Sequence, residues 1–147
     1  MAAGRNEGLT KTFTAGGTIN DARILKFGSA DNLVVQATAA TDALIGISKV
    51  PQGQQQRAIQ TGPTPPTIPT VTIAANQRVD VVLEGIAEVL FGGNITRGAL
   101  ITSDANGKAV AAAPAVGVNN RVIGVAMCSG VDGDIGTVLI SPGVMQG

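Results

Sequence analysis

The chain has 147 residues, enough for one domain with a sizeable core, and its ten basic and ten acidic side chains give a formal net charge of zero. No two lysines or arginines are adjacent, so the clustered cations of a phosphate-binding surface are missing and a nucleic-acid partner is not expected. No run approaches the ~18 apolar residues of a membrane span. The N-terminus lacks the apolar core of a secretion signal, which predicts synthesis in the cytoplasm and no membrane partner.

The residue types of catalysis are also scarce. Histidine, the most common general base and metal ligand, is absent. The single cysteine, Cys128, lies in an apolar run with no neighbouring cation and is interpreted as a small buried residue. The acidic turns at 104–107 and 132–134 lack the full ligand set of a calcium loop. We therefore expect no catalytic residue, no metal site, no cofactor and no enzymatic activity.

Residues 1–14 are mostly polar and are predicted to be an extended N-terminal arm, with 15–147 forming a single β domain. Two interpretations of the arm stay open: a frayed terminus, or a segment that becomes ordered on a partner. Short apolar runs then predict strands at 18–27, 33–38 and 44–48, with a turn at 28–32 and a helical turn or tight bend at 39–43.

Residues 51–70 hold five of the seven prolines and a glutamine-rich stretch. Proline cannot donate to a β-ladder and restricts the residue before it, so this segment is predicted to be a long loop rather than a central strand. Compact domains rarely keep loops of this length unless the loop contacts something or is disordered. Contact with a neighbouring subunit and a plain surface loop are equally compatible with it.

The clearest strand pattern runs from 79 to 91, where every odd position is apolar or glycine. Gly85 keeps this alternation and is interpreted as a bend or a close backbone approach. Glu84 and Glu88 fall on the other face, about 13 Å apart by strand rise. That separation is too large for the usual carboxylate pair of a glycosidase, so the two acids are interpreted as a solvated or inter-subunit face.

Two hairpins follow. Runs at 99–103 and 108–112 flank Asn106 and Gly107, the strongest short-range hairpin signal, in which both residues can adopt positive φ. Runs at 122–128 and 135–140 flank a second turn, and residues 141–143 are expected to end the last strand. The spacing of elements predicts an all-β domain, a small antiparallel β-barrel or sandwich.

A weak internal echo is also present. The run 44–48 (Leu-Ile-Gly-Ile-Ser) is similar to 122–126 (Val-Ile-Gly-Val-Ala), and each follows a small-residue stretch that itself follows a turn. This pattern raises the hypothesis of a duplicated strand–turn–strand unit. Alanine-rich segments align easily, so chance similarity is the alternative.

The order of the runs at 36–47, 81–89, 92–110, 121–126 and 133–143 resembles that of tailed-bacteriophage capsid decoration (cement) proteins. The resemblance implies a β-tulip-like domain on the outer surface of the virion head, reinforcing junctions between major capsid protein subunits. It implies self-association, with a homotrimer favoured and a dimer open. Residues 51–70 have no counterpart in this resemblance.

Within this interpretation, we expect capsid contacts from the arm and inter-subunit or capsid contacts from the proline-rich loop and the acidic face. The arm residues are Arg5, Asn6, Thr10, Lys11 and Phe13, and the others are Gln55, Arg57, Pro65, Pro66, Glu84 and Glu88. The alternatives are another virion component, such as a tail protein or the base of a head fibre, and a carbohydrate-binding β domain. Sugar sites usually present aromatic platforms, and three phenylalanines with no tryptophan or tyrosine disfavour the last.

Overall fold

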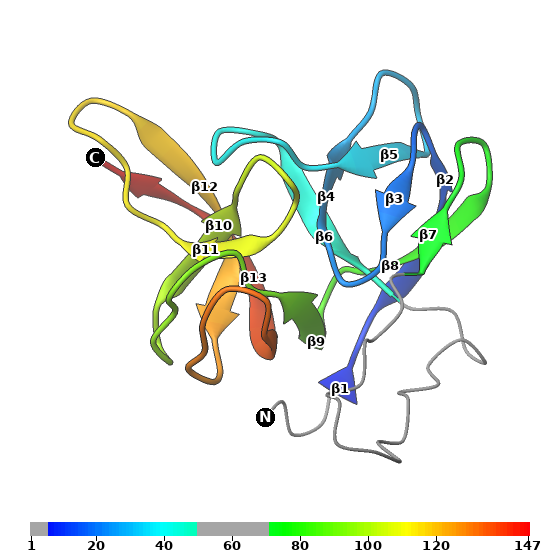
Figure 1. Cartoon of the computed structure of the whole chain (residues 1–147). Helices are drawn as coiled ribbons and strands as arrows, with labels where there is room; N and C mark the ends of the chain where they lie inside the picture. Colours follow the sequence, from blue (N-terminus) through cyan, green and yellow to red (C-terminus); the bar gives the residue numbers. More distant parts are fainter. Residues whose placement is uncertain (1–5, 50–70) are drawn as a thin grey trace, which may run out of the picture.

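The computed structural model describes residues 6–49 and 71–147, and the regular structure in these ranges is entirely β. Figure 1 shows two bodies side by side, with β2–β8 in one and β9–β13 in the other. The prediction of an all-β protein built on a small barrel is confirmed. The strands are β1 (Asn6–Glu7), β2 (Thr10–Ala15), β3 (Ile19–Asn20), β4 (Ile24–Phe27), β5 (Leu33–Gln36), β6 (Leu44–Ser48), β7 (Thr72–Ile73), β8 (Arg78–Val82), β9 (Gly85–Leu90), β10 (Leu100–Ser103), β11 (Ala109–Ala111), β12 (Asn119–Ala126) and β13 (Ile135–Gln146).

The first unit, β2–β8, contains a closed barrel of order β2-β5-β4-β6-β8. Its neighbours pair antiparallel except β2 and β5, which pair in parallel through Thr14 and Ala15. This parallel pairing closes the barrel and removes an exposed sheet edge. The interior is filled by Phe13, Ala15, Ile19, Leu25, Val34, Ile73, Val79 and Val81, all buried.

The second unit, β9–β13, forms most of a six-stranded sheet of order β1-β9-β13-β12-β10-β11. The sheet curls until Phe91, just after β9, makes a parallel bridge with Ala109 in β11. The Gly92 N–H donates to the Ala109 carbonyl at 2.8 Å, which supports this bridge. Phe91 is fully buried and is one of the largest side chains in the core of this unit.

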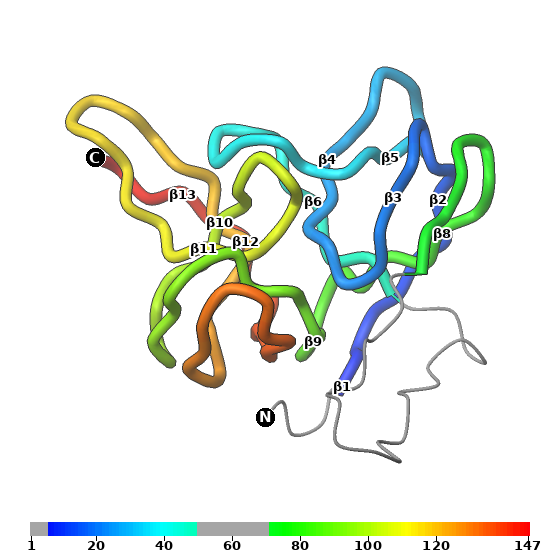
Figure 2. Tube along the Cα trace, viewed as in Figure 1, coloured from blue at the N-terminus to red at the C-terminus, as the bar shows by residue number. Residues whose placement is uncertain are grey.

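The two units have the same strand connectivity. The strands β2, β4, β5, β6 and β8 of the first unit correspond in order and pairing to β9, β10, β11, β12 and β13. Even the parallel closure is repeated, since β2 meets β5 in the first unit and Phe91 meets β11 in the second. Figure 2 lets the reader follow the two circuits along the chain.

The correspondence extends to individual residues. Leu25 lies opposite Gly46 between β4 and β6, and Ile101 lies opposite Gly124 between β10 and β12. The bridge of Ile95 with Gly130 takes the place of the β3–β7 pair.

The turn that leads into the last strand of each unit is also the same. The Asn76 N–H donates to the Ala15 carbonyl at 2.7 Å, and the Gly133 N–H donates to the Phe91 carbonyl at 3.0 Å. Asn76 and Gly133 both have positive φ. The hypothesis of a duplicated unit is therefore confirmed, and the duplication covers five strands rather than the two of a strand–turn–strand unit.

The units differ most between their fourth and fifth strands. In the second unit Met127 and Cys128 follow β12 directly, whereas in the first unit the proline-rich residues 50–70 separate Lys49 from Val71. That segment lies outside the described residues, and so does the loop predicted for it. Its position shows that it is an insertion into an otherwise repeated unit.

The predicted N-terminal arm is wrong for the part that the structure describes. β1 pairs with β9, and β2 pairs with both β5 and β8. Residues 6–7 and 10–14 therefore belong to the two sheets, and the expected boundary after residue 14 falls inside β2. Phe13 is buried in the barrel. The threonines of β2 hide this role, because their polar side chains alternate with Phe13 and Ala15 on the inner face.

The alternation at 79–91 belongs to two strands, not one. β8 ends at Val82, and β9 begins at Gly85, whose φ of +98° turns the chain from the first unit into the second. A Cβ on Gly85 would lie 2.4 Å from the Asn6 carbonyl oxygen, so the predicted bend and close backbone approach are both present. Similarly, the predicted strand at 18–27 is interrupted between β3 and β4, where Ala22 has a φ of +52°.

The two predicted hairpins are present with two corrections. In the turn between β10 and β11 Gly107 has positive φ but Asn106 does not, because the Asp104 Oδ1 atom accepts from the Asn106 N–H at 2.7 Å and from the Lys108 N–H at 2.9 Å. The last strand also does not stop at 141–143. β13 continues to Gln146 because Pro142 lies at a bulge, where the register with β12 shifts and no ladder donor is needed.

Candidate functional site

The chain crosses between the units twice, at one place. The Gly8 N–H donates to the Glu84 carbonyl at 2.9 Å, and the Leu83 N–H donates to the Leu9 carbonyl at 2.8 Å. Residues 8–9 therefore run beside residues 83–84 from one unit to the other. This double connection fixes how the units are oriented at the seam.

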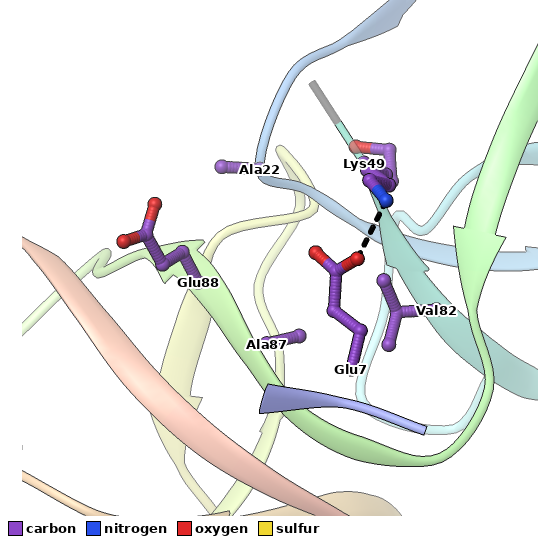
Figure 3. Close-up of a pocket in the computed structure, with 7 residues that line it drawn as sticks. Glu7, Ala22, Lys49, Val82, Ala87 and Glu88 are labelled. Carbon is purple, nitrogen blue, oxygen red and sulfur yellow. Dashed lines mark ion pairs between the residues drawn. The ribbon is translucent and has the colours of Figure 1, made fainter. Parts of the chain in front are cut away.

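A small cavity lies at this seam (Figure 3). It is lined by both units, with Glu7, Ala87 and Glu88 on one side and Ala22, Ser48, Lys49 and Val82 on the other. The Lys49 Nζ atom lies 2.6 Å from a Glu7 carboxylate oxygen, and both side chains are largely buried. With a volume of about 10 Å³ the cavity is at the lower limit for one water molecule. The cavity is too small for an organic ligand. Its ion pair joins the units, because Lys49 follows β6 and Glu7 lies in β1, which pairs with β9.

The hairpin between β10 and β11 makes a second junction. The Ile24 N–H donates to the Gly107 carbonyl at 2.8 Å, and the Gln36 Nε2 atom donates to the Asn106 carbonyl at 2.8 Å. Further along, the Arg121 N–H donates to the Ala40 carbonyl at 2.7 Å. The most distinctive turn of the sequence therefore holds the second unit against the first.

Arg23 carries an unusual polar atom near this junction. Its Nη1 atom donates to the Asp21 carbonyl at 3.1 Å, while its buried Nε atom has no hydrogen-bond partner among the described residues. Burial lowers the pKa of the Arg23 guanidinium, although the charges of Asp21 and Asp104 act in the opposite direction. Burial likewise raises the pKa of Asp21 above its ordinary value. The pair lies in the connection between β3 and β4.

Asp42 organises the bend at 39–43. Its Oδ2 atom accepts from the Thr38 N–H at 2.8 Å and the Ala39 N–H at 2.9 Å, and it lies 3.1 Å from the Lys26 Nζ atom. Burial alone would raise the pKa of Asp42, but the hydrogen bonds and the charge of Lys26 together lower it below its ordinary value. The sequence left a helical turn or a tight bend open, and the structure has the bend.

The ionisable side chains of the described residues form no metal-binding group. Within residues 6–49 and 71–147, no three His, Cys, Asp or Glu side chains are grouped so that they could hold a metal ion. Cys128 is partly buried against the second core, and its Sγ atom accepts from the Thr137 N–H at 3.4 Å. No helix long and apolar enough to cross a membrane occurs in the described parts of the chain.

The structure separates the predicted contact residues of the arm. Asn6, Thr10 and Lys11 are exposed, whereas Phe13 is buried and cannot meet a partner. The Lys11 Nζ atom lies 4.8 Å from the centre of the Phe13 ring and donates to the Asn32 Oδ1 atom at 3.1 Å. Lys11 thus covers one end of the barrel interior.

The predicted acidic face is also divided. Glu84 is exposed and lies between β8 and β9, while Glu88 is half-buried in β9 and lines the seam cavity. The single strand face expected for the two acids is wrong because Gly85 turns the chain between them. The remaining predicted contacts, namely Arg5, Gln55, Arg57, Pro65 and Pro66, lie outside the described residues.

One exposed surface was missed. Leu100, Val125, Leu139 and Ile86 lie opposite one another in register across β10, β12, β13 and β9. They point away from the core, because their neighbours Ile101, Ala126, Ile140 and Ala87 are buried. A signal for this surface was present, since the unbroken apolar run at 138–140 indicates a strand covered on both faces.

These features define the class of the protein as a tandem of two five-stranded β units with a shared seam. No protein-family model matches the chain, and no curated protein matches it by sequence. Among solved structures, the chain is similar to the base of the head fibre protein gp8.5 of bacteriophage phi29. The TM-score is 0.56 and the sequence identity 19%, over 90% of this chain and 93% of that one. At this identity the likeness shows the fold.

Proposed function

We propose that the protein is a structural component of a bacteriophage virion, and that it serves as the base of a head fibre attached to the outside of the head. The observation that carries this proposal is the fold similarity to the phi29 head fibre base, which extends over nearly the whole of both chains. A similarity limited to one β unit would say nothing about the arrangement of the two units. Here the similarity covers 90% of the chain and therefore includes both units.

The composition and the site support a role in binding rather than catalysis. The chain has no histidine, and the cavity at the seam is of water size and contains an ion pair. An aromatic sugar platform has little to build on, because Phe13 and Phe91 are buried and Phe27 is the exposed phenylalanine among the described residues. A carbohydrate-binding function is therefore disfavoured.

The proposed partner is the major capsid protein, with further contacts to other copies of the same chain. Each contact between a virion component and the shell is repeated at many equivalent positions, so modest individual affinities combine. The exposed Asn6, Thr10 and Lys11 are proposed to contact the capsid, as is Glu84. They lie on or next to β1, the start of β2 and the connection between units.

Reinforcement of the shell is the finer form of this proposal. A protein that binds the intact junction between capsid subunits, but not the open junction, stabilises it by mass action. The resemblance of the glycine turns and aliphatic runs to capsid decoration proteins favours this role. A fibre base and a reinforcing protein would both bind the outside of the head, and they differ in whether the head becomes more resistant to rupture.

The test combines the purified protein with empty heads and with isolated tails, followed by electron microscopy. We expect added density on the head surface and none on tails. Density on tails alone would contradict the proposed attachment and favour a tail component. Heating heads with and without bound protein then tests reinforcement, since an unchanged rupture temperature at full occupancy would exclude it while leaving the fibre-base role intact.

A further inference from the structure

The duplicated architecture contains the same aliphatic row twice. In the first unit, Ile24 of β4 lies opposite Ile47 of β6, which lies opposite Val82 of β8. In the second unit, Leu100 of β10, Val125 of β12 and Leu139 of β13 occupy the corresponding positions, and Ile86 of β9 extends the row. We call these the first-unit row and the second-unit row.

The first-unit row is covered by the second unit of the same chain. Ile24, Ile47 and Val82 are at most 1% exposed, although their side chains lie outside their own barrel. They belong to one buried cluster with second-unit residues such as Val89 and Ile123. Strand β6 also contacts β9, β12 and β13. An aliphatic row at this position is thus an interface between two β units.

The second-unit row has no such cover among the described residues. Leu100 and Leu139 are each 41% exposed, and Val125 and Ile86 are partly exposed between them. Four aliphatic side chains in register across four strands form a contiguous apolar surface, whereas an antiparallel sheet with one free face usually presents polar residues there.

The charge pattern permits contact with another copy of the chain. The second-unit row itself contains no ionisable side chain. Met127, Thr137 and Glu88 form the neighbouring row on the same face, and Glu88 lines the seam cavity. Covering this surface would therefore bury no charge from the row itself.

We propose that the second-unit row is the surface through which one copy of the chain binds a second copy, head to tail. The face that the second unit presents to the first is already occupied within each chain. We place the covering face on the first unit of the next copy, because that unit repeats the strand order of the second unit. A repeated head-to-tail contact of this kind generates a closed ring or an open filament. The inference rests on the self-association included in the proposed function, and attachment to heads is measured separately.

The test uses Leu139→Lys and Leu100→Lys, with Val116→Lys as the matched control. Val116 is 97% exposed and lies outside the row. Analytical ultracentrifugation over a range of concentrations gives the dissociation constant of each form. We expect oligomers from the unaltered chain and from Val116→Lys. Each row substitution should raise the dissociation constant about tenfold or more, since a lysine in a buried apolar contact lacks a partner. Circular dichroism confirms that the variants remain folded.

Three outcomes would overturn the inference. The first is that the unaltered chain sediments as a monomer at every concentration. The second is that both row variants associate as strongly as the control. The third is that an equal mixture of Leu139→Lys and Leu139→Glu recovers association. That result would mean that the rows of two copies pack against each other, rather than one row against the first unit of the next copy. Loss of head binding by Leu139→Lys, with a monomeric unaltered chain, would instead assign the row to the capsid. Failure to bind heads by an oligomeric chain would contradict only the proposed function.

Discussion

Gly136 in β13 lies directly against the ring of Phe91, and the substitution Gly136→Ala tests how tightly the second unit is packed. A Cβ at this position would lie 2.0 Å from Phe91 Cζ and 2.5 Å from Cε1. Real contacts of this type are not shorter than about 3 Å, so either the ring or strand β13 must move. The φ of Gly136 is not in the left-handed region, and the effect is therefore steric.

The ring has little freedom to move. Phe91 is fully buried, its N–H donates to the Asp134 carbonyl at 2.8 Å, and its carbonyl accepts from the Gly133 N–H at 3.0 Å. Overpacking of a core typically costs about 1–3 kcal/mol. Complete loss of the ring's packing sets an upper limit of about 3–5 kcal/mol. We expect Gly136→Ala to lower the free energy of unfolding by about 2–3 kcal/mol, in the upper part of the overpacking range and below this limit.

Urea unfolding followed by circular dichroism measures this change, with Gly143→Ala as the control. A Cβ on Gly143 meets nothing within 4 Å, so its replacement should change stability by less than about 1 kcal/mol. Phe91→Leu should relieve the clash, so Gly136→Ala should cost less in that background. An equal cost with and without the phenylalanine ring would refute the steric explanation.

Four further substitutions test the duplicated packing, β2 and the bend at 39–43. Gly46→Ala and Gly124→Ala should each lower the free energy of unfolding in urea by about 1–3 kcal/mol. A Cβ at Gly46 would lie 2.4 Å from the Val82 carbonyl oxygen, and a Cβ at Gly124 would lie 2.0 Å from the Leu139 carbonyl oxygen. A neutral result for either substitution would contradict the equivalence of the two sites. Phe13→Ala should cost about 3–5 kcal/mol if β2 is a core strand, whereas a detached arm would give no loss. Asp42→Asn should lower stability near neutral pH by about 1–2 kcal/mol, mainly through its backbone hydrogen bonds. Because the folded-state pKa of Asp42 is lowered, its contribution is present above the ordinary value of 3.8 and is lost as pH falls through the folded-state pKa. The difference from the unaltered chain should therefore shrink in acid, and a constant difference across pH would exclude ionisation as its source.

Local patterns identified most strands because turns and alternation are local properties. Gly107 and Gly133 both mark turns with positive φ, and the Asn-Gly hairpin is where the sequence indicates. Long-range pairing was not accessible in the same way. Nothing near Thr14 in sequence indicates that β2 pairs in parallel with β5, and Gly85 keeps the alternation while the chain passes from one unit to the other.

The contact surface was harder to predict than the fold. Phe13 was expected to meet a partner and is buried, because its strand completes a barrel whose other members are distant in sequence. Conversely, Leu139 lies in an apolar run that predicts a strand, yet it is 41% exposed, because alternate residues of a strand point to opposite faces. Which of the two faces is covered depends on the placement of the other unit, and a single strand carries no information about that placement.

The double connection between the units has a consequence for assembly at different concentrations. A single β unit with a row like Ile24, Ile47 and Val82 would need another molecule to cover it. Joining the units through residues 8–9 and 83–84 makes one such contact intramolecular, so its effective concentration does not depend on how much protein is present. The contact proposed for the second-unit row has no such link. Dilution should therefore separate copies of the chain while the two units within each copy stay together.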